Sequence, residues 1–259
     1  MRCLTLIFLT ALMTGCVTSS SVLNDSIAAS LTQIHIVPIE GPPLSGRDLS
    51  GGLSGAELVA GATTTGSNAL LLAGGILMLM EVPEANLRSA AASENIESLL
   101  DRHEIWEPTA EIAKETMRQL ETASNFPVTA SLDVKPLPGV KRREATLFME
   151  NWMAPLRAYY NMGSTPYNYS EQPSYGAVLE VGILNYELSA GYFLVQVTMK
   201  LVDPATGAVM ANTRKFSNSK IGDPDRLFDD NAAAYKQLFR DTTKALVTEC
   251  IDNLGLGKS

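Results

Sequence analysis

Histidines could serve as metal ligands, and this chain has only two, His35 and His103. His103 opens the run His-Glu-Ile-Trp-Glu, which is half of the H-E-x-x-H pattern that binds zinc on one helix face. Glu107 stands where the second histidine is needed. A histidine-based zinc site therefore cannot be assembled. We expect His103 to be a surface residue and His35 to be packed or hydrogen-bonded within a strand.

Carboxylates cluster at Asp223, Asp225, Asp229 and Asp230. A calcium loop of the EF-hand type would need another spacing and a central glycine. Carboxylates are favoured at a helix start by its exposed N–H groups, so we expect helix capping here. The G-x-S-x-G, G-x-x-x-x-G-K-[ST] and G-x-G-x-x-G patterns are also missing from the sequence. These observations predict no catalytic residue, no metal and no cofactor, and thus a protein that is not an enzyme.

Cys16 is the residue for which the sequence predicts a chemical modification. Arg2 provides a positive charge, residues 4–13 form a short apolar stretch, and Thr14 and Gly15 are small, which is the pattern of a secretory signal. The apolar stretch is too short to span a bilayer, which takes about 20 residues. Residues 1–15 are therefore predicted to be a signal peptide. The alternatives are a signal anchor, or an exported soluble protein in which Cys16 is incidental.

Met13-Thr14-Gly15-Cys16 resembles the lipobox of bacterial lipoproteins, in which leucine more often stands at the position of Met13. The resemblance implies diacylglycerol on the Cys16 thiol, cleavage before Cys16 and acylation, for example with palmitate, of the new N-terminus. Several acyl chains bind a membrane durably, since each buried methylene contributes about 0.8 kcal/mol. Val17, which is not acidic, follows the cysteine. By the same resemblance this favours the inner leaflet of the bacterial outer membrane, with the domain facing the periplasm.

The composition limits the partners. The chain has 259 residues, a net charge of −8 and 46% hydrophobic residues, which suits one large domain with an ample core. The acidic balance argues against nucleic acid and against electrostatic docking on anionic lipid. Cys3 would leave with the signal and Cys16 would be alkylated, so Cys250 has no partner for a disulfide. We expect Cys250 to be a buried, unreactive thiol.

A tether followed by one domain is expected. Residues 16–30 are rich in Ser, Thr and Asn and predict a lipidated flexible tether. Residues 31–259 predict a single α/β domain with a Gly/Ala/Leu-rich insertion near 51–82. Its predicted elements up to residue 160 are a strand at 33–39, helices at 84–102 and from Pro108 to about residue 123, a strand near 129–134, and a helix over 141–154 that Pro155 should kink or end.

The C-terminal third has the clearest β pattern. Segments 177–188 and 192–202 alternate in hydrophobicity across a tight turn, and residues 208–216 follow a second turn. A long amphipathic helix should start at Asp223-Pro224, end at Gly255 and cover this meander. The fold class is therefore α/β, a mixed sheet with a C-terminal three-stranded antiparallel meander packed by helices and a long C-terminal helix. One face of the first meander strand should carry Val178, Glu180, Gly182, Leu184 and Tyr186.

Tyrosines gather in a loop rich in Pro, Asn and Ser. Five of the eight tyrosines lie within 17 residues, namely Tyr159, Tyr160, Tyr167, Tyr169 and Tyr175. Tyrosine offers a large contact area with a polar tip and is enriched at interfaces. These residues are candidate contacts for an unidentified envelope protein. The alternative is that the rings pack the loop onto the domain.

The stretch 58–80 has 23 residues without a charge. That length could cross a membrane, but polar residues break its first half and leave the apolar run 69–80, the length of a buried helix. Gly74 and Gly75 would let a neighbouring helix approach closely. The segment could thus be a buried or surface-packed helix, a membrane-inserting or self-associating segment, or a mobile loop. Its candidate membrane or oligomer contacts are Leu70, Leu71, Leu72, Gly74, Gly75 and Ile76.

The predicted order of elements resembles the bacterial lipoproteins related to the curli secretion protein, the penicillin-binding-protein activator lipoprotein and the N-terminal domain of TolB. The resemblance is carried by residues 34–39, 177–181 and 199–209, the last of which contains the turn Asp203-Pro204-Ala205-Thr206-Gly207. In the curli channel, as the family is understood, long transmembrane hairpins inserted in this region build the pore. Here the connections at 189–191 and 203–207 are too short for strands of about 9 to 11 residues, so no such pore is expected.

The sequence therefore predicts a lipid-anchored periplasmic protein that binds another cell-envelope component and assists its assembly, export or activity. The alternative is a self-assembling ring or translocation accessory that uses 58–80 for oligomer or membrane contact. The expected partners are the membrane, through lipidated Cys16, and an unidentified envelope protein. Nucleic acid is not expected.

Overall fold

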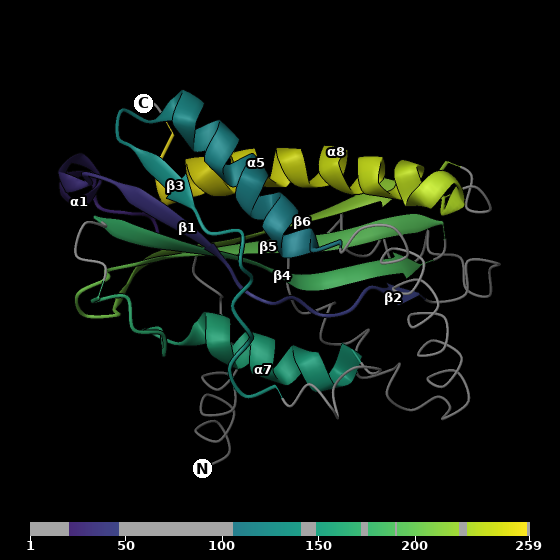
Figure 1. Cartoon of the computed structure of the whole chain (residues 1–259), viewed down its shortest axis with the longest axis horizontal. Coiled ribbons are helices and arrows are strands. Elements are labelled where there is room, and N and C mark those ends of the chain that lie inside the picture. Colours follow the sequence, from purple (N-terminus) through teal and green to yellow (C-terminus); the bar gives the residue numbers. More distant parts are fainter. Residues whose placement is uncertain are drawn as a thin grey trace, which may run out of the picture.

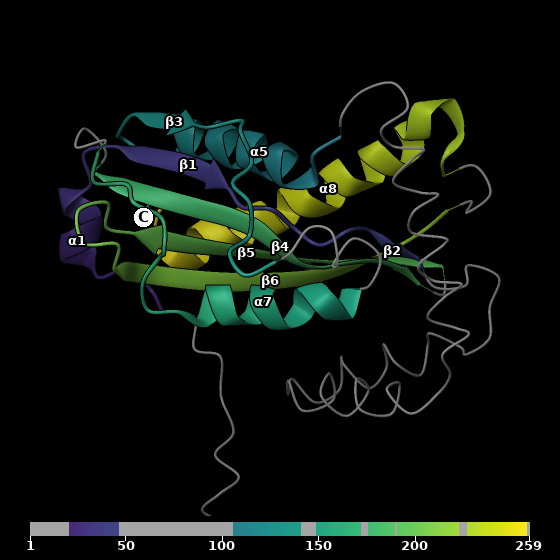
Figure 2. The ribbon, with the colours of Figure 1, turned by 60° about the horizontal axis from the view of Figure 1, so that its bottom comes forward.

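The computed structural model describes residues 21–46, 106–140, 149–171, 176–189, 191–222 and 227–257. The predicted signal peptide, Cys16, the uncharged stretch 58–80 and the helix expected at 84–102 lie outside these residues. The described elements form three layers. A sheet carries α5 and α8 on one face and α7 on the other (Figures 1 and 2).

The sheet joins an N-terminal strand to the C-terminal meander. Its order is β3-β1-β4-β5-β6, and β2 pairs with the end of β4. β1 pairs in parallel with β3 and β4, and β2 pairs in parallel with β4. β5 pairs antiparallel with β4 and with β6. The predicted mixed sheet and meander are therefore confirmed. The strands are β1 (Ile34–Pro38), β2 (Ser45–Gly46), β3 (Val128–Ala130), β4 (Ala177–Ser189), β5 (Tyr192–Val202) and β6 (Val209–Lys220).

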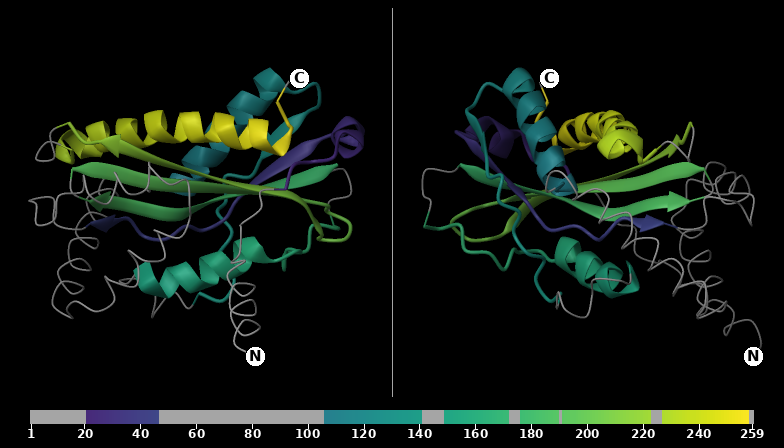
Figure 3. Two further views of the ribbon diagram at one scale, coloured as in Figure 1. Left: turned by 180° about the vertical axis from the view of Figure 1, so that it is seen from behind. Right: turned by 45° about the vertical axis from the view of Figure 1, so that its right-hand side comes forward.

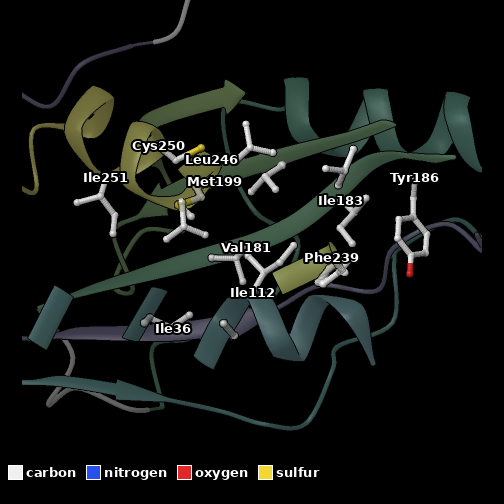
Figure 4. Packing of buried hydrophobic residues seen from close by; sticks show 14 of the residues in the cluster. Ile36, Ile112, Val181, Ile183, Tyr186, Met199, Phe239, Leu246, Cys250 and Ile251 are labelled. Carbon is white, nitrogen blue, oxygen red and sulfur yellow. The ribbon is translucent and has the colours of Figure 1, made fainter. Parts of the chain in front are cut away.

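The larger core lies between the sheet and the helices α5 (Pro108–Ala123) and α8 (Asp229–Leu254). Pro108 occupies the first turn of α5, where its missing N–H removes no helical bond. Figure 4 shows Ile112 of α5, Val181 of β4 and Phe239 of α8 converging in this core. The long C-terminal helix therefore covers the meander, as its amphipathic face predicts.

The end of α8 follows the prediction and its start does not. Gly255 has φ +75° and ends the helix, while the Leu256 N–H donates to the Ile251 carbonyl at 3.1 Å. The helix begins at Asp229, later than Asp223-Pro224, and Leu227 and Phe228 form a turn before it. Asp223 and Asp225 lie outside the described residues. The N-cap position of α8 is Phe228, which makes no side-chain capping hydrogen bond, so the predicted capping of this helix by the Asp cluster is not observed among the described residues.

The smaller core lies beneath α7 (Met149–Asn161). Pro155, expected to kink or end a helix over 141–154, does not end it, because α7 continues to Asn161. Trp152, Leu156 and Tyr159 repeat along the buried side of α7 and pack on the sheet. Their burial offsets the roughly 3 kcal/mol that an interior proline costs, so tertiary packing overrides the local signal.

Residues 21–30, which were predicted to be part of a flexible tether, belong to the domain. Ser21 forms an isolated bridge to Asn212 of β6, and the Leu23 N–H donates to the Leu254 carbonyl at 3.3 Å. The Leu23 side chain is buried in the larger core, and α1 (Asp25–Ser30) follows it. Burial of a leucine contributes about 1.5–3 kcal/mol, which favours order in a segment whose polar composition predicts flexibility.

The two ends of the sheet differ in what they carry. One end carries α1, the C-terminal end of α8 and the β5–β6 turn, and the other carries β2 and the β4–β5 turn (Figures 1 and 3). Within the described part of the chain, no helix is both long enough and apolar enough to cross a bilayer. We call the end of the sheet that carries α1 the α1 end, and the end that carries β2 the β2 end.

Candidate functional site

A buried ion pair lies on the face of the sheet that α7 covers. Glu180 of β4 and Lys200 of β5 are directly opposite each other, with Lys200 Nζ 3.3 Å from Glu180 Oε2. Both side chains have 0% exposure. Desolvation of two such charges costs several kcal/mol each, which is compensated only when hydrogen bonds satisfy the remaining polar atoms.

Hydrogen bonds to Glu180 Oε1 and from Lys200 come from α7 and the loop that follows it, residues 162–171, whereas Glu180 Oε2 has no hydrogen-bond partner among the described residues and is compensated by the ion pair. Thr165 Oγ1 and the Tyr169 hydroxyl both donate to Glu180 Oε1, at 2.6 and 2.9 Å. Lys200 Nζ donates to the Tyr159 carbonyl at 3.2 Å and lies 3.8 Å from the centre of the Tyr159 ring, a cation–π contact. We call Tyr159, Thr165, Tyr169, Glu180 and Lys200 the charge cluster.

Burial controls the protonation of this cluster. Desolvation lowers the pKa of Lys200, while Glu180 opposes that shift. The pKa values of Tyr159 and Tyr169 are raised far above the ordinary tyrosine value, first by burial and then by the neighbouring Glu180 carboxylate. The Tyr169 hydroxyl therefore stays protonated and remains a donor to Glu180 across the physiological range.

The geometry suits a positioning role better than chemistry on a substrate. In the described part of the chain neither Glu180 nor Lys200 exposes any surface, so a molecule from solvent does not reach the charges. The cluster instead ties loop 162–171 to the centre of the sheet. The same loop reaches the β5–β6 turn, where the Thr165 N–H donates to the Gly207 carbonyl at 2.8 Å.

Three of the five tyrosines predicted as partner contacts are buried. Tyr159 and Tyr169 belong to the charge cluster, and Tyr160 packs edge-on against Tyr159. The packing alternative therefore holds for these three tyrosines, and the prediction that they contact a partner is wrong. Tyr167 is half-buried, and its hydroxyl donates to the Pro136 carbonyl. Tyr175 lies outside the described residues. A tyrosine-rich loop can thus reflect the need to satisfy a buried carboxylate.

Other predicted residues behave as packed groups. His35 Nδ1 is 2.8 Å from Thr129 Oγ1, and burial and the charge of Lys135 lower the His35 pKa. Cys250 is buried, as predicted, and burial raises the pKa of its thiol to about 12, which disfavours the reactive thiolate. No group of three or more His, Cys, Asp or Glu side chains suited to a metal ion occurs among the described residues. His103 is not among them.

A groove between α5 and α8 offers the other candidate. It has a volume of about 290 Å³ and is lined by Arg118, Gln119 and Lys244, among other residues. Several of its polar groups are already engaged, since Arg118 binds Glu115 and the Gln119 amide joins Thr248 and the Lys244 carbonyl at 2.9 and 3.0 Å. The groove therefore shows a helix–helix contact and no assembled binding site.

The Glu180–Lys200 pair is absent from the sequence-based site prediction. Its signal in the sequence is one acidic and one basic residue, each directly flanked by apolar residues: Leu179 and Val181 beside Glu180, and Met199 and Leu201 beside Lys200. Charged residues are rarely fully buried unless they are paired. Such residues on neighbouring predicted strands would have indicated an internal ion pair.

No family model matches the chain, and no curated protein matches it. Several solved structures are similar to the chain at low identity and low TM-score. They include the PelC dodecamer from Paraburkholderia phytofirmans (TM-score 0.35, 9% identity, 91% of this chain and 94% of that chain), protein XCC0632 from Xanthomonas campestris (0.35, 12%, 88% and 90%) and lipoprotein GNA1162 from Neisseria meningitidis (0.25, 12%, 82% and 99%). Similarities at this level identify neither a family nor a function, so the lipoprotein resemblance stays a prediction.

Proposed function

We propose that this chain is a non-enzymatic protein, anchored by lipid at Cys16, that binds another cell-envelope component and assists its assembly, export or activity. The observation that carries the proposal is the position of Ser21. Ser21 is bridged to Asn212 of β6 and lies five residues after the cysteine of the lipobox-like motif. A lipid on Cys16 would therefore hold a folded body directly at a membrane.

The described chemistry supports a binding role. Glu180, Lys200 and Cys250 are among the buried groups that could act as acid, base or nucleophile, and each is packed away from solvent in the described structure. A catalytic group has to reach its substrate. The protein would then act through contact between its surface and a partner. Crosslinking in intact cells, followed by identification of the captured protein, would reveal that partner.

Cys16→Ser tests the anchor. The variant is expected to move from the membrane fraction to the soluble periplasmic fraction, because the thioether-linked diacylglycerol can form only on a cysteine. Cell fractionation followed by immunoblotting measures the change, and Cys250→Ala, which removes the other cysteine of the predicted mature chain, is expected to remain with the membrane. If Cys16→Ser stays in the membrane fraction, another segment, such as 58–80, is the anchor.

Self-assembly is a second candidate, favoured by the outer edge of β6. β6 is an edge strand, and from Arg214 to Lys220 its outer side has no paired strand among the described residues. Phe216 on this stretch is 47% exposed. Open edges can pair with a strand of another chain.

Light scattering on the soluble Cys16→Ser protein distinguishes the two candidates. A concentration-independent monomer is expected if the protein acts by binding a different envelope component. A larger assembly that dissociates when Asn218→Pro removes an outward N–H from the β6 edge would favour self-assembly. Lys215→Pro is unsuitable as a control because it would also break the pairing with β5, so Asn218→Ala is the matched control.

A further inference from the structure

We propose that the α1 end of the domain rests on the lipid bilayer, with Val22 and Ile27 in contact with lipid. This orientation presupposes the proposed lipidation of Cys16 and adds to it the surface that meets the membrane. It is carried by the position of Ser21 in the domain, by the small number of residues between Cys16 and Ser21, and by the apolar side chains that are exposed next to Ser21.

Ser21 is held at the α1 end of the domain by several contacts. The Asn212 N–H donates to the Ser21 hydroxyl at 3.0 Å and to the Ser21 carbonyl at 3.3 Å. Leu23 is buried and hydrogen-bonds to Leu254 at the end of α8. Ser21 therefore cannot swing away from the domain without exposing Leu23 and breaking these bonds.

The chain between the lipid and this point is short. Five Cα–Cα steps separate Cys16 from Ser21, and a fully extended chain spans at most about 3.6 Å per residue, or about 18 Å in total. β6 alone has 12 residues, a length of about 40 Å at 3.3 Å each. A lipid on Cys16 thus holds the α1 end near the bilayer, while Lys220 at the far end of β6 can stand about 26 Å beyond Asn212.

Exposed apolar side chains lie at this end. Val22 is 65% exposed and Ile27 is 38% exposed, and both follow Ser21 closely in sequence. Val22 also lies beside Gly255, at the end of α8. With a net charge of −8 the protein gains little from electrostatic attraction to anionic lipid. Apolar contact by Val22 and Ile27 would therefore orient the domain, while the acyl chains supply the affinity.

This orientation places the β2 end away from the bilayer. β2 pairs with Glu187 and Leu188 near the β4–β5 turn, at the opposite end of the sheet from Ser21. That end would face the periplasm and be accessible to an envelope partner.

Site-directed fluorescence on the full-length lipidated protein tests the orientation. Val22→Cys, Ile27→Cys and, as the matched far-end control, Lys220→Cys are each labelled with an environment-sensitive nitrobenzoxadiazole dye. Cys250 is buried with a raised pKa and is not expected to react. Each protein is placed in phosphatidylethanolamine–phosphatidylglycerol vesicles with or without nitroxide-labelled lipid. Blue-shifted emission and a loss of fluorescence to the nitroxide are expected at positions 22 and 27, and neither at 220.

Several outcomes would overturn the orientation. Quenching at 220 that equals or exceeds quenching at 22 and 27 would mean that another face meets the lipid. A blue shift at 22 and 27 without nitroxide quenching would mean that a protein, such as a second copy, covers this end. Mass spectrometry of the same samples separates these failures from failure of the proposed function, which an unmodified Cys16 would show.

A longer tether provides an independent test. Inserting about ten Gly and Ser residues after Val17 adds up to about 36 Å of reach and leaves the lipobox-like motif intact. Quenching at positions 22 and 27 is expected to fall, because the domain can then leave the surface. Unchanged quenching in the lengthened protein would show that the short tether does not set the orientation.

Discussion

Lys200→Met is expected to lower the free energy of unfolding by about 3–5 kcal/mol. Methionine nearly preserves the length of the side chain but removes its charge, which leaves the Glu180 carboxylate buried without its cation. Thr165 and Tyr169 would still donate to Glu180 Oε1, but Oε2 would lose the ammonium group 3.3 Å away. Urea unfolding followed by far-ultraviolet circular dichroism measures the loss, with the soluble Cys16→Ser protein as background.

Glu180→Gln in the same chain is the matched second change. Glutamine keeps an oxygen that can accept from Thr165 and Tyr169 but carries no charge. The double variant Glu180→Gln/Lys200→Met is therefore expected to be more stable than Lys200→Met alone. If the two changes instead destabilise additively, or if Lys200→Met costs less than about 1 kcal/mol, the pair does not organise this face of the sheet.

Gly182→Ala is expected to cost about 1–3 kcal/mol, as overpacking of a filled core does. A Cβ at position 182 would overlap the Tyr160 hydroxyl and lie 2.9 Å from Tyr160 Cζ. The Tyr160 ring cannot move aside easily, because it is buried and packs edge-on against the Tyr159 ring at 5.0 Å. The change would push α7 away from β4, and thermal unfolding would record the lower midpoint.

Tyr160→Phe completes a double-mutant cycle with Gly182→Ala. Among the described residues the Tyr160 hydroxyl has no hydrogen-bond partner, and an unsatisfied buried hydroxyl is unfavourable. Tyr160→Phe alone is therefore expected to leave stability unchanged or to raise it. It should also recover part of the Gly182→Ala loss, since it removes the atom that overlaps most. A Gly182→Ala loss that Tyr160→Phe leaves untouched would exclude this contact as the cause.

These two contacts explain why α7 and loop 162–171 stay on the sheet. Gly182 makes room for the Tyr160 ring, and the Glu180–Lys200 pair holds Tyr159, Thr165 and Tyr169. Loop 162–171 also bridges to the β5–β6 turn through Ser164 and Ala208, at the end of the sheet where Ser21 pairs with β6. The charge cluster therefore stabilises the part of the domain that would lie nearest the membrane.

Local sequence signals determined most of the elements of the fold. The β-branched run at 33–39, Pro108 at a helix start, the alternating strands of the meander and Gly255 after the last helix each predict the element that is observed. These signals depend on the residue itself and its near neighbours. The signals that failed are those outweighed by distant packing: Pro155 does not end α7, and the polar segment 21–30 belongs to the domain because Leu23 reaches the core.

The composition of the charge cluster was also visible in the sequence, but its assembly was not. The hairpin starts with Ser189 opposite Tyr192. Continued without interruption, that register would place Leu201 opposite Glu180 and Val181 opposite Lys200, so the two charges would lie on opposite faces of the sheet. The irregularity between Ile183 and Asn185 shifts the register by one residue and sets Glu180 opposite Lys200.

The same shift explains the one misplaced residue of the strand prediction. Val178 and Leu184 face α7 as expected, whereas Tyr186 lies on the α8 side with Phe193 and Phe239. Alternation in the sequence determined that these segments are strands and that one face buries apolar groups. Only the tertiary structure decided where the alternation breaks. The position of a bulge depends on packing, because helices cover both faces of the sheet and their side chains must fill the space on each face.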